Sequence, residues 1–433
     1  MSEPLETFSL AKGFRATATS CGLKTSGVMG ASALDMALVA AEGPCSAAGV
    51  FTTNKVKAAP VRYDQEVLAA NPGGIRAVVV NAGNANACTG PQGMVDCRRM
   101  AELVAYGLRC QPGEVLVLST GVIGRPLPME KVAQGIATLT SPAAGRGAAL
   151  AARAIMTTDT RPKVASARIH AGGRAVTISG FCKGAGMIHP NMATMLAVIT
   201  TDAQVAPEVL DRALRAAVNK SFNRISVDGD TSTNDTVLLL ASGASGVTIV
   251  PEEEGRGEDS PSPQDTSRSL SLHTFISSLT DVCVSLAKQV ARDGEGATRL
   301  VEILVTGARS EAEAHQVANS IARSPLVKTA VHGGDPNWGR VLCAAGYSGA
   351  DIDPERLSLT FGPADRPGDS DTPAVQVVAG GLPTDADLRL ASAALRADPA
   401  HIHLDLGLGQ ASATVWTCDL SAEYVTINAH YTT

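Results

Sequence analysis

A hydroxyl group placed to act as a nucleophile stands in the stretch Lys183–Ala203, which reads KGAGMIHPNMATMLAVITTDA. Gly184 and Gly186 allow backbone angles that residues with a Cβ avoid, and Pro190 fixes its own φ, so the chain must turn sharply here. Thr194 follows this turn and begins a mostly apolar run of strand length. A threonine hydroxyl held between a turn and a rigid strand suits nucleophilic catalysis.

The peptide bond between Ala193 and Thr194 gives the same stretch a second chemical possibility. If that bond were cut, the new α-amine of Thr194 could serve as the base for its own hydroxyl, and no separate histidine would be needed. The residues equally suit a glycine-rich turn that leads into a core strand, with Thr194 simply beginning the strand. The local sequence leaves both interpretations open.

Two short apolar runs, 77–81 and 115–119, are typical of buried strands, and each runs into a loop of mostly small residues. The segment 94–108 between them has helical spacing, so the alternation predicts a layered α/β domain. Thr120 and Gly121 begin the loop after the second strand. Backbone N–H groups in such a loop can approach a ligand closely, which makes both residues candidates for an oxyanion hole, although an ordinary turn fits as well.

Three further segments are candidates for the walls of such a site. Glu295 stands between two glycines after a helical segment, where its carboxylate could meet a substrate ammonium or be a solvated turn residue. The compact loop 333–340 is predicted to pack beside the site. The C-terminal segment 424–433 has no charged tail and is predicted to be ordered and packed.

Metal and nucleotide sites are not expected. The loop Asp228–Asp235 is rich in oxygen ligands but does not match an EF-hand, so a hydrogen-bonded turn is favoured over a metal site. His401, His403 and Asp405 could bind zinc, yet any half-buried strand shows the same alternation, and no further ligand cluster stands nearby in sequence. The glycines of 184–186 form only a fragment of a dinucleotide fingerprint, without its strand and helix.

The composition is that of a globular protein without a strongly charged surface. The 433 residues carry 36 Lys and Arg against 42 Asp and Glu, a net charge of −6, and 3% are aromatic. Neither electrostatics nor stacking therefore favours a nucleic-acid partner. Nine scattered cysteines without a C-x-x-C pair favour reduced thiols inside a cell. No apolar run approaches membrane-spanning length, and the acidic N-terminus lacks a signal peptide, so the protein is predicted to be cytoplasmic, with no membrane partner.

The segment 251–271 differs in composition from the rest of the chain and reads PEEEGRGEDSPSPQDTSRSLS. Its proline, serine and charged residues cannot bury enough apolar surface to offset the entropy of ordering. It is therefore predicted to be a disordered and dispensable surface insertion.

Eight blocks of this sequence carry a resemblance to one family. They are NAGNANACTG, LSTGVIG, MTTDT, KGAGMIHPNMATMLAVITTDA, SFNRISVDGDTSTNDT, RDGEGATR, HGGDPNWGR and YVTINAHYTT. In this order they resemble the ornithine acetyltransferase (glutamate N-acetyltransferase) family of arginine biosynthesis, over nearly the whole chain. The resemblance implies a layered α/β sandwich in two lobes, with helices flanking stacked sheets. It also implies a precursor that cuts itself between Ala193 and Thr194, into an α chain of residues 1–193 and a β chain of residues 194–433.

The activity that this resemblance implies is acetyl transfer. Thr194 would take the acetyl group from N2-acetylornithine and pass it to glutamate in a ping-pong cycle that needs no cofactor, with acetyl-CoA left open as a second acetyl donor. Thr120 and Gly121 match the family's oxyanion-hole pair. The positions that match its substrate contacts are Thr157, Lys183, Thr194, Glu295, Asn428 and Thr433. The cleaved pair is expected to double into an α2β2 heterotetramer.

Two other functions stay open at this point. A self-cleaving aminopeptidase or amidohydrolase of related fold would use the same nucleophile with water as the acceptor, and an uncleaved scaffold would only bind acetylated amino acids. Acetate release distinguishes the first of these from a transferase, because a transferase must protect its acyl-enzyme from water. Ala185 stands where the family often has a small hydroxyl residue, and this departure could alter the cleavage rate.

Overall fold

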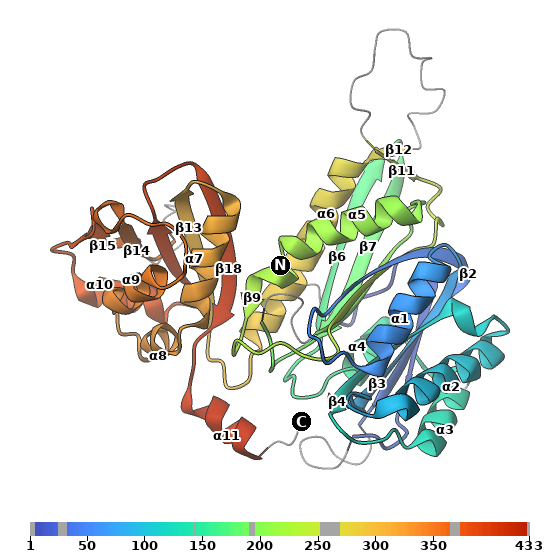
Figure 1. Ribbon diagram of the computed structural model, residues 1–433. Coiled ribbons are helices and arrows are strands. Elements are labelled where there is room, and N and C mark those ends of the chain that lie inside the picture. The colour runs from blue at the N-terminus through green and yellow to red at the C-terminus, as the bar shows by residue number, and fades with distance from the viewer. Residues whose placement is uncertain are drawn as a thin grey trace, which may run out of the picture.

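The computed structural model shows two lobes (Figure 1). The residues that it describes are 5–24, 33–142, 144–189, 195–251, 269–363 and 373–430. The larger lobe is built on a nine-stranded sheet and the smaller lobe on a seven-stranded sheet, and there is a further two-stranded sheet. Both large sheets contain parallel and antiparallel pairs. The predicted α/β class is therefore confirmed as a mixed α/β fold with two mixed sheets.

The larger sheet places its strands in the order β4-β3-β2-β10-β8-β7-β6. The bounds are β2 Met36–Phe51, β3 Ile75–Asn84, β4 Val115–Val122, β6 Lys163–Ala171, β7 Arg174–Lys183, β8 Leu196–Thr201 and β10 Thr236–Ala241. β1 (Phe14–Thr19) pairs with β2, and β5 (Gly145–Arg146) pairs with β1. β8 lies inside the sheet, parallel to β10 and antiparallel to β7.

Helices cover both faces of this sheet. They are α1 Ala59–Ala70, α2 Gly90–Leu108, α3 Met129–Leu139, α4 Ala148–Ala154, α5 Pro207–Asn219 and α6 Leu272–Arg292. Along β8, Leu196 and Val198 belong to the core cluster that α1 to α4 complete, whereas Ala197 and Ile199 belong to the cluster of α5 and α6. A strand covered on both faces is apolar throughout, so the predicted burial of this run on two faces is confirmed.

The smaller sheet has the strand order β16-β15-β14-β17-β13-β18-β9 and its own core. The strand bounds are β9 Ile225–Ser226, β13 Leu300–Ala308, β14 Ser358–Phe361, β15 Val375–Ala379, β16 Leu382–Pro383, β17 Ala400–Asp405 and β18 Ala411–Cys418. The helices are α7 Glu311–Arg323, α8 Pro325–Gly333, α9 Trp338–Gly346 and α10 Leu388–Arg396. β9 follows α5 of the larger lobe in the chain but pairs with β18, so it ties the two lobes together.

The remaining elements are short. They are β11 Thr248–Val250, β12 Ser269–Ser271, the 3-10 turns Pro112–Glu114, Phe222–Arg224 and Pro354–Arg356, and helix α11 Ala422–His430. α11 leaves the smaller lobe and extends below it, toward the larger lobe (Figure 1). It contains no buried residue, so the prediction of a packed C-terminal segment was wrong for the described part. Just before α11, the Ser421 hydroxyl donates to the carbonyl of Gly296 over 2.6 Å.

Predicted elements agree with the structure where the hydrophobic spacing is strong. The segment 94–108 lies within α2, and the runs 77–81 and 115–119 lie within β3 and β4. The loop 333–340 does not line the pocket described below and belongs to the smaller lobe, so its predicted place beside the site was wrong. Trp338 from this loop packs against the core of that lobe instead. Most of the predicted insertion 251–271 lies outside the described residues.

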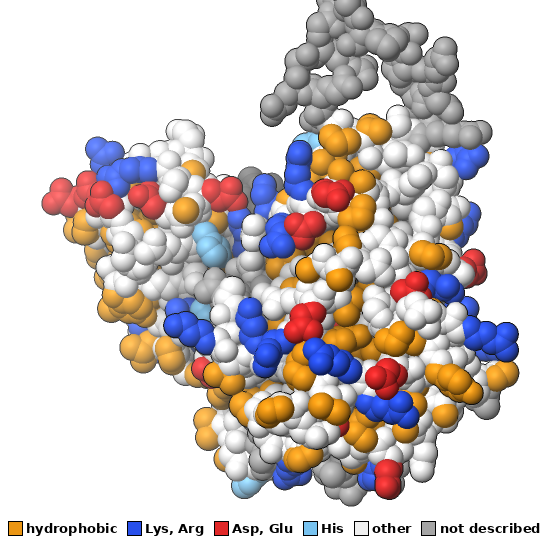
Figure 2. All heavy atoms as spheres, turned by 45° about the vertical axis from the view of Figure 1, so that its right-hand side comes forward, with side chains coloured by type: hydrophobic (Ala, Val, Ile, Leu, Met, Phe, Trp, Pro, Cys, Tyr) orange, Lys and Arg blue, Asp and Glu red, His pale blue; other side chains and the backbone are white. Residues whose placement is uncertain are grey.

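The surface shows no segregation of charge on the face drawn in Figure 2. Lysine and arginine side chains there are interspersed with aspartate and glutamate, in keeping with the near balance of charges in the sequence. Within the described ranges, none of the helices combines the length and the apolar character needed to cross a membrane.

The apolar face of α6 offers a test of how the larger lobe is held together. Leu279 is fully buried in the cluster of α5 and α6. Leu279→Ala should leave a cavity and lower the free energy of unfolding by about 2 to 5 kcal/mol. Leu390→Ala removes the same atoms from a half-exposed position on α10 and should change that free energy by only about 0.5 kcal/mol. Urea unfolding followed by circular dichroism measures both, and equal losses would contradict this assignment of the core.

Candidate active site

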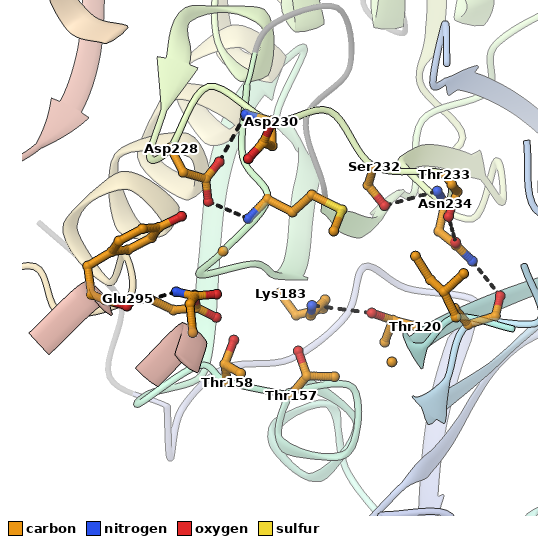
Figure 3. Close-up of a pocket in the computed structure, with 17 residues that line it drawn as sticks. Thr120, Thr157, Thr158, Lys183, Asp228, Asp230, Ser232, Thr233, Asn234 and Glu295 are labelled. Atoms are coloured by element: carbon orange, nitrogen blue, oxygen red, sulfur yellow. Dashed lines mark hydrogen bonds between the residues drawn. The ribbon is translucent and has the colours of Figure 1, made fainter. Parts of the chain in front are cut away.

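One pocket gathers polar side chains from distant parts of the chain (Figure 3). The ends of β4 and β7, the loop before β6, the loop after β9 and the turn after α6 form its walls, and α11 reaches it from the smaller lobe. The lining residues are Ala85, Thr120, Gly121, Ile123, Thr157, Thr158, Lys183, Gly186, Met187, Asp228, Asp230, Ser232, Thr233, Asn234, Glu295, Tyr424 and Asn428.

Most of the predicted site residues meet at this pocket. Those that line it are Thr120, Gly121, Thr157, Lys183, Glu295 and Asn428. Ala193, Thr194 and Thr433 lie outside the described residues. Met195 is the first described residue after this gap, and its backbone N–H donates to Oδ1 of Asp235 over 3.0 Å. Asp235 is fully buried, and burial raises the pKa of its carboxyl well above the usual range.

Thr120 and Gly121 were predicted to begin a loop, but the structure places both within β4, at an irregular end of its pairing with β3 that requires glycine at 121. Gly121 has a φ of +131°, and a Cβ placed on it would stand 2.3 Å from the carbonyl carbon of Gly83. The close approach of β3 and β4 therefore excludes any side chain here. The amide of Asn234 donates to the carbonyl of Ser119 over 2.8 Å and fixes the end of β4 against the loop after β9. The backbone at this end of β4 is thus held rigidly at the pocket wall.

Lys183 places a buried cation beside this end of β4. Its side chain is only 4% exposed, and Nζ donates to Oγ1 of Thr120 over 3.3 Å. Burial lowers the pKa of the Lys183 ammonium, while the charges of Asp159 and Glu295 act in the opposite direction. Among the described residues no carboxylate forms an ion pair with Lys183, so its ammonium is available to a carboxylate of a ligand.

Glu295 is held at the other side of the pocket by backbone and side-chain contacts. Its N–H donates to the carbonyl of Ala185 over 2.8 Å. The amide of Asn428, from α11, donates to Oε2 of Glu295 over 2.9 Å. The carboxylate lies against Gly186, where a Cβ would stand 2.4 Å from Oε2. A side chain at position 186 would therefore displace the Glu295 carboxylate from this place, whereas the left-handed backbone of the predicted turn occurs at Gly184 and Met187.

Beneath the pocket, a fully buried ion network positions two of its walls. Nζ of Lys163 lies 2.6 Å from Oδ1 of Asp159 and 2.6 Å from Oδ2 of Asp293. Asp159 also accepts the N–H of Gly184 over 2.7 Å and the N–H of Thr157 over 3.0 Å. Burial alone would raise the pKa of Asp159, but Lys163, Lys183 and these hydrogen bonds hold it well below its usual range. The network therefore fixes the segments that carry Thr157 and Lys183.

The loop after β9 is a wall that the sequence interpretation missed. Asp228 accepts N–H groups from Met187 over 2.6 Å and from Ile188 over 2.9 Å, so it holds the glycine-rich turn from outside. Burial raises the pKa of Asp228 to about 6. The sequence analysis singled out Asp228–Asp235 for its many oxygen atoms and predicted a hydrogen-bonded turn. The N–H of Asp230 donates to Oδ1 of Asp228, so this turn is confirmed. Throughout the described ranges, no three His, Cys, Asp or Glu side chains gather as metal ligands.

Comparison with known proteins gives one family. The chain matches the ArgJ family over residues 15–433. The arginine biosynthesis bifunctional protein ArgJ of Geobacter sulfurreducens is 49% identical over 428 residues, 98% of this chain and 99% of that protein. The solved structure of the protein of that name from Bacillus halodurans is 42% identical, with a TM-score of 0.46, over 54% of this chain and 98% of that one. The ornithine acetyltransferase from Mycobacterium tuberculosis, solved with ornithine, is 41% identical, with a TM-score of 0.34, over 42% of this chain and 92% of that one.

The buried ion network predicts a large effect of removing its cation. Lys163→Met removes the buried cation that Asp159 and Asp293 share, leaves Asp293 only the longer contact with the exposed Arg161, and should lower the free energy of unfolding by about 3 to 5 kcal/mol. Arg215→Met breaks an exposed ion pair with Asp211 and should lower it by less than about 1 kcal/mol.

The pH dependence of stability should change sign in Lys163→Met. In the parent protein the lowered pKa of Asp159 contributes stability above the unfolded pKa of about 4, and this contribution is lost as the pH falls. Without Lys163, burial should raise that pKa, so the stability of the variant should decrease as the pH rises above about 4. Urea unfolding at pH 3, 5 and 8 measures this, since the parent should lose the Asp159 contribution between pH 5 and pH 3 and the variant should lose stability between pH 5 and pH 8. Parallel pH profiles for the two proteins would contradict it.

Proposed function

The chain belongs to the ArgJ family and is therefore an acyltransferase, an ornithine acetyltransferase, and from this premise we propose how its own residues perform the reaction. Thr194 takes the acetyl group from N2-acetylornithine and passes it to glutamate. The single observation that carries this proposal is the meeting of six predicted residues, from five separate segments, around one pocket. They are Thr120, Gly121, Thr157, Lys183, Glu295 and Asn428.

The first half-reaction forms an ester on Thr194. The α-amine of Thr194 accepts the proton of its own hydroxyl as Oγ1 attacks the acetyl carbonyl, the amide C–N bond breaks, and ornithine leaves after its nitrogen is protonated. In the second half-reaction the α-amine of Thr194 takes a proton from the ammonium of glutamate, and the freed amine attacks the ester carbonyl. The bond between the acetyl carbon and Oγ1 breaks, Oγ1 recovers the proton from the α-amine, and the new amide nitrogen releases its extra proton to solvent. Each step passes through an oxyanion on the acetyl group.

Thr120 and Gly121 would stabilise this oxyanion. The Oγ1 atom of Thr120 already accepts a hydrogen bond from Lys183, so its own O–H hydrogen is free to be donated. The backbone N–H of Gly121 supplies a second donor, from a position in β4 that leaves no room for a side chain. Donors fixed in advance at a partly dehydrated site stabilise developing charge without having to reorganise.

The amine of Thr194 requires cleavage of the peptide bond after Ala193, which would give chains of residues 1–193 and 194–433. After such a cleavage the hydrogen bond from Met195 to Asp235 would anchor the residue that follows the new terminus. We place the two chains in an α2β2 heterotetramer in the cytoplasm, with acetyl-CoA as an additional acetyl donor, in line with the word bifunctional in the names of the relatives.

Thr194→Ala tests the nucleophile and the cleavage together. The variant should run as one chain in denaturing electrophoresis and should transfer no acetyl group, because both the hydroxyl and its base are lost. Thr280→Ala is a matched control on α6, where the hydroxyl donates only to the carbonyl of Ile276, and it should be cleaved and active. A cleaved or active Thr194→Ala would contradict the proposal.

Lys183→Met tests recognition of the carboxylate that donor and acceptor share. Removing a charged hydrogen bond worth about 1.5 to 3 kcal/mol should lower kcat/KM about ten-fold or more for both acetylornithine and glutamate. Lys220→Met, at an exposed position after α5, should leave both values unchanged. The same assay should follow acetate, since acetate release that exceeds acetylglutamate formation would favour a hydrolase.

A further inference from the structure

The proposed reaction makes an unusual demand on one pocket. Donor and acceptor share an α-nitrogen and an α-carboxylate, but the side chain of acetylornithine ends in an ammonium and the side chain of glutamate ends in a carboxylate. In a ping-pong cycle both must enter the same site. Rigidly held protein groups can therefore bind the α-nitrogen and the α-carboxylate, which both substrates have. The end of the substrate side chain needs instead a protein carboxylate that binds the ammonium of the donor and moves aside for the carboxylate of glutamate.

The pocket already contains rigid partners for the shared groups. Lys183 is buried and bonded to Thr120, and it suits the α-carboxylate. Glu295 is 9% exposed and is held by Asn428, and it suits the α-nitrogen, which becomes an ammonium when ornithine leaves and arrives as one with glutamate. Lys183 and Glu295 are therefore both occupied, and another residue must bind the side-chain ammonium of the donor.

Three carboxylates line the pocket, and they differ in how firmly they are held. Glu295 accepts from Asn428, and Asp228 accepts from three backbone N–H groups, those of Met187, Ile188 and Asp230. The carboxylate of Asp230, by contrast, has no hydrogen bond or ion pair to any residue that the structure describes, and this residue is exposed. Figure 3 shows Asp228 and Asp230 on the opposite side of the pocket from Thr120.

The turn that carries Asp230 keeps its carboxylate close to the other acidic groups. Gly229 has a φ of +85°, so the chain reverses between the two aspartates. Asp228, Asp230 and Glu295 line the pocket together with Tyr424, and their charges add to the effect of burial, which raises the pKa of the Tyr424 phenol to about 12. This side of the pocket is therefore negative, whereas the side near Lys183 is positive.

We propose that Asp230 is a specificity-determining residue that binds the side-chain ammonium of the acetyl donor and turns toward solvent when an anionic acceptor occupies the pocket. The inference rests on the proposed function and deepens it. An exposed side chain without partners can rotate away at little cost, whereas Asp228 and Glu295 would have to break hydrogen bonds to do so. The chemical class that Asp230 selects is an N2-acylated amino acid with a cationic side chain.

Asp230→Asn gives the direct test because it keeps the size of the side chain and removes its charge. Initial rates of the cleaved enzyme yield separate kcat/KM values for the two half-reactions. The value for acetylornithine should fall about five-fold, the size expected for a solvent-accessible ion pair. The value for glutamate should stay unchanged or rise, because a like charge is removed. Asp230→Lys should widen this difference further.

Asp281→Asn is the matched control, an exposed aspartate on α6 that does not line the pocket, and it should change neither value. An unchanged kcat/KM for acetylornithine in Asp230→Asn, or an equal fall for both substrates, would overturn the inference. If the parent enzyme transferred no acetyl group at all, the proposed function would fail instead. Calorimetry would then decide the role of Asp230, since ornithine should bind Asp230→Asn more weakly than the parent protein while glutamate should not.

Discussion

The candidate site depends on one buried interaction, the contact of Lys163 with Asp159 and Asp293. The cation lies on the first residue of β6, one carboxylate lies in the loop before β6, and the other caps the end of α6. Because none of these charges reaches solvent, each is tolerable only while the others are in place. The same carboxylates bind backbone N–H groups of Thr157, Thr160 and Gly184. The position of the pocket walls is thus coupled to the stability of the larger lobe.

A second constraint is the division of the pocket into a positive and a negative side. On the positive side, Lys183 suits a carboxylate and the end of β4 at Thr120 suits a developing oxyanion. On the negative side, Asp228, Asp230 and Glu295 line the pocket near Tyr424. A free amino acid carries both signs, so it can be oriented by charge alone before any specific contact forms. The side chain of the donor is positive and that of the acceptor is negative. This difference explains why Asp230 would be free to move while Asp228 and Glu295 are held by hydrogen bonds.

The sequence predicted those parts of the molecule that depend on neighbouring residues. The apolar run of β8 and the helical spacing of α2 follow from local patterns, and the structure confirms both. The meeting of Thr120, Lys183 and Glu295 followed only from the family resemblance. β4 and β7 are separated in the sheet by β3, β2, β10 and β8, so neither residue spacing nor strand order indicates that Thr120 and Lys183 meet at one pocket. The wall formed by Asp228 and Asp230 was missed for a similar reason. It exists because β9 pairs with β18 across the two lobes, and two residues of strand carry no signal of such a distant partner. The loop 333–340 was placed beside the site because it is compact, and the segment that forms α11 was predicted to be packed because it has no charged tail. Neither property indicates which hydrophobic core a segment packs against.

The central claim is that Thr194 becomes the first residue of a chain and carries the acetyl group. Intact mass spectrometry of the purified protein, before and after addition of acetylornithine, tests it most directly. The account predicts two polypeptides, 1–193 and 194–433, and the mass of one acetyl group added to the second after acetylornithine is supplied without glutamate. It also predicts that glutamate then removes this group. A single full-length chain that transfers acetyl groups, or an acetyl group found on the 1–193 chain, would contradict it.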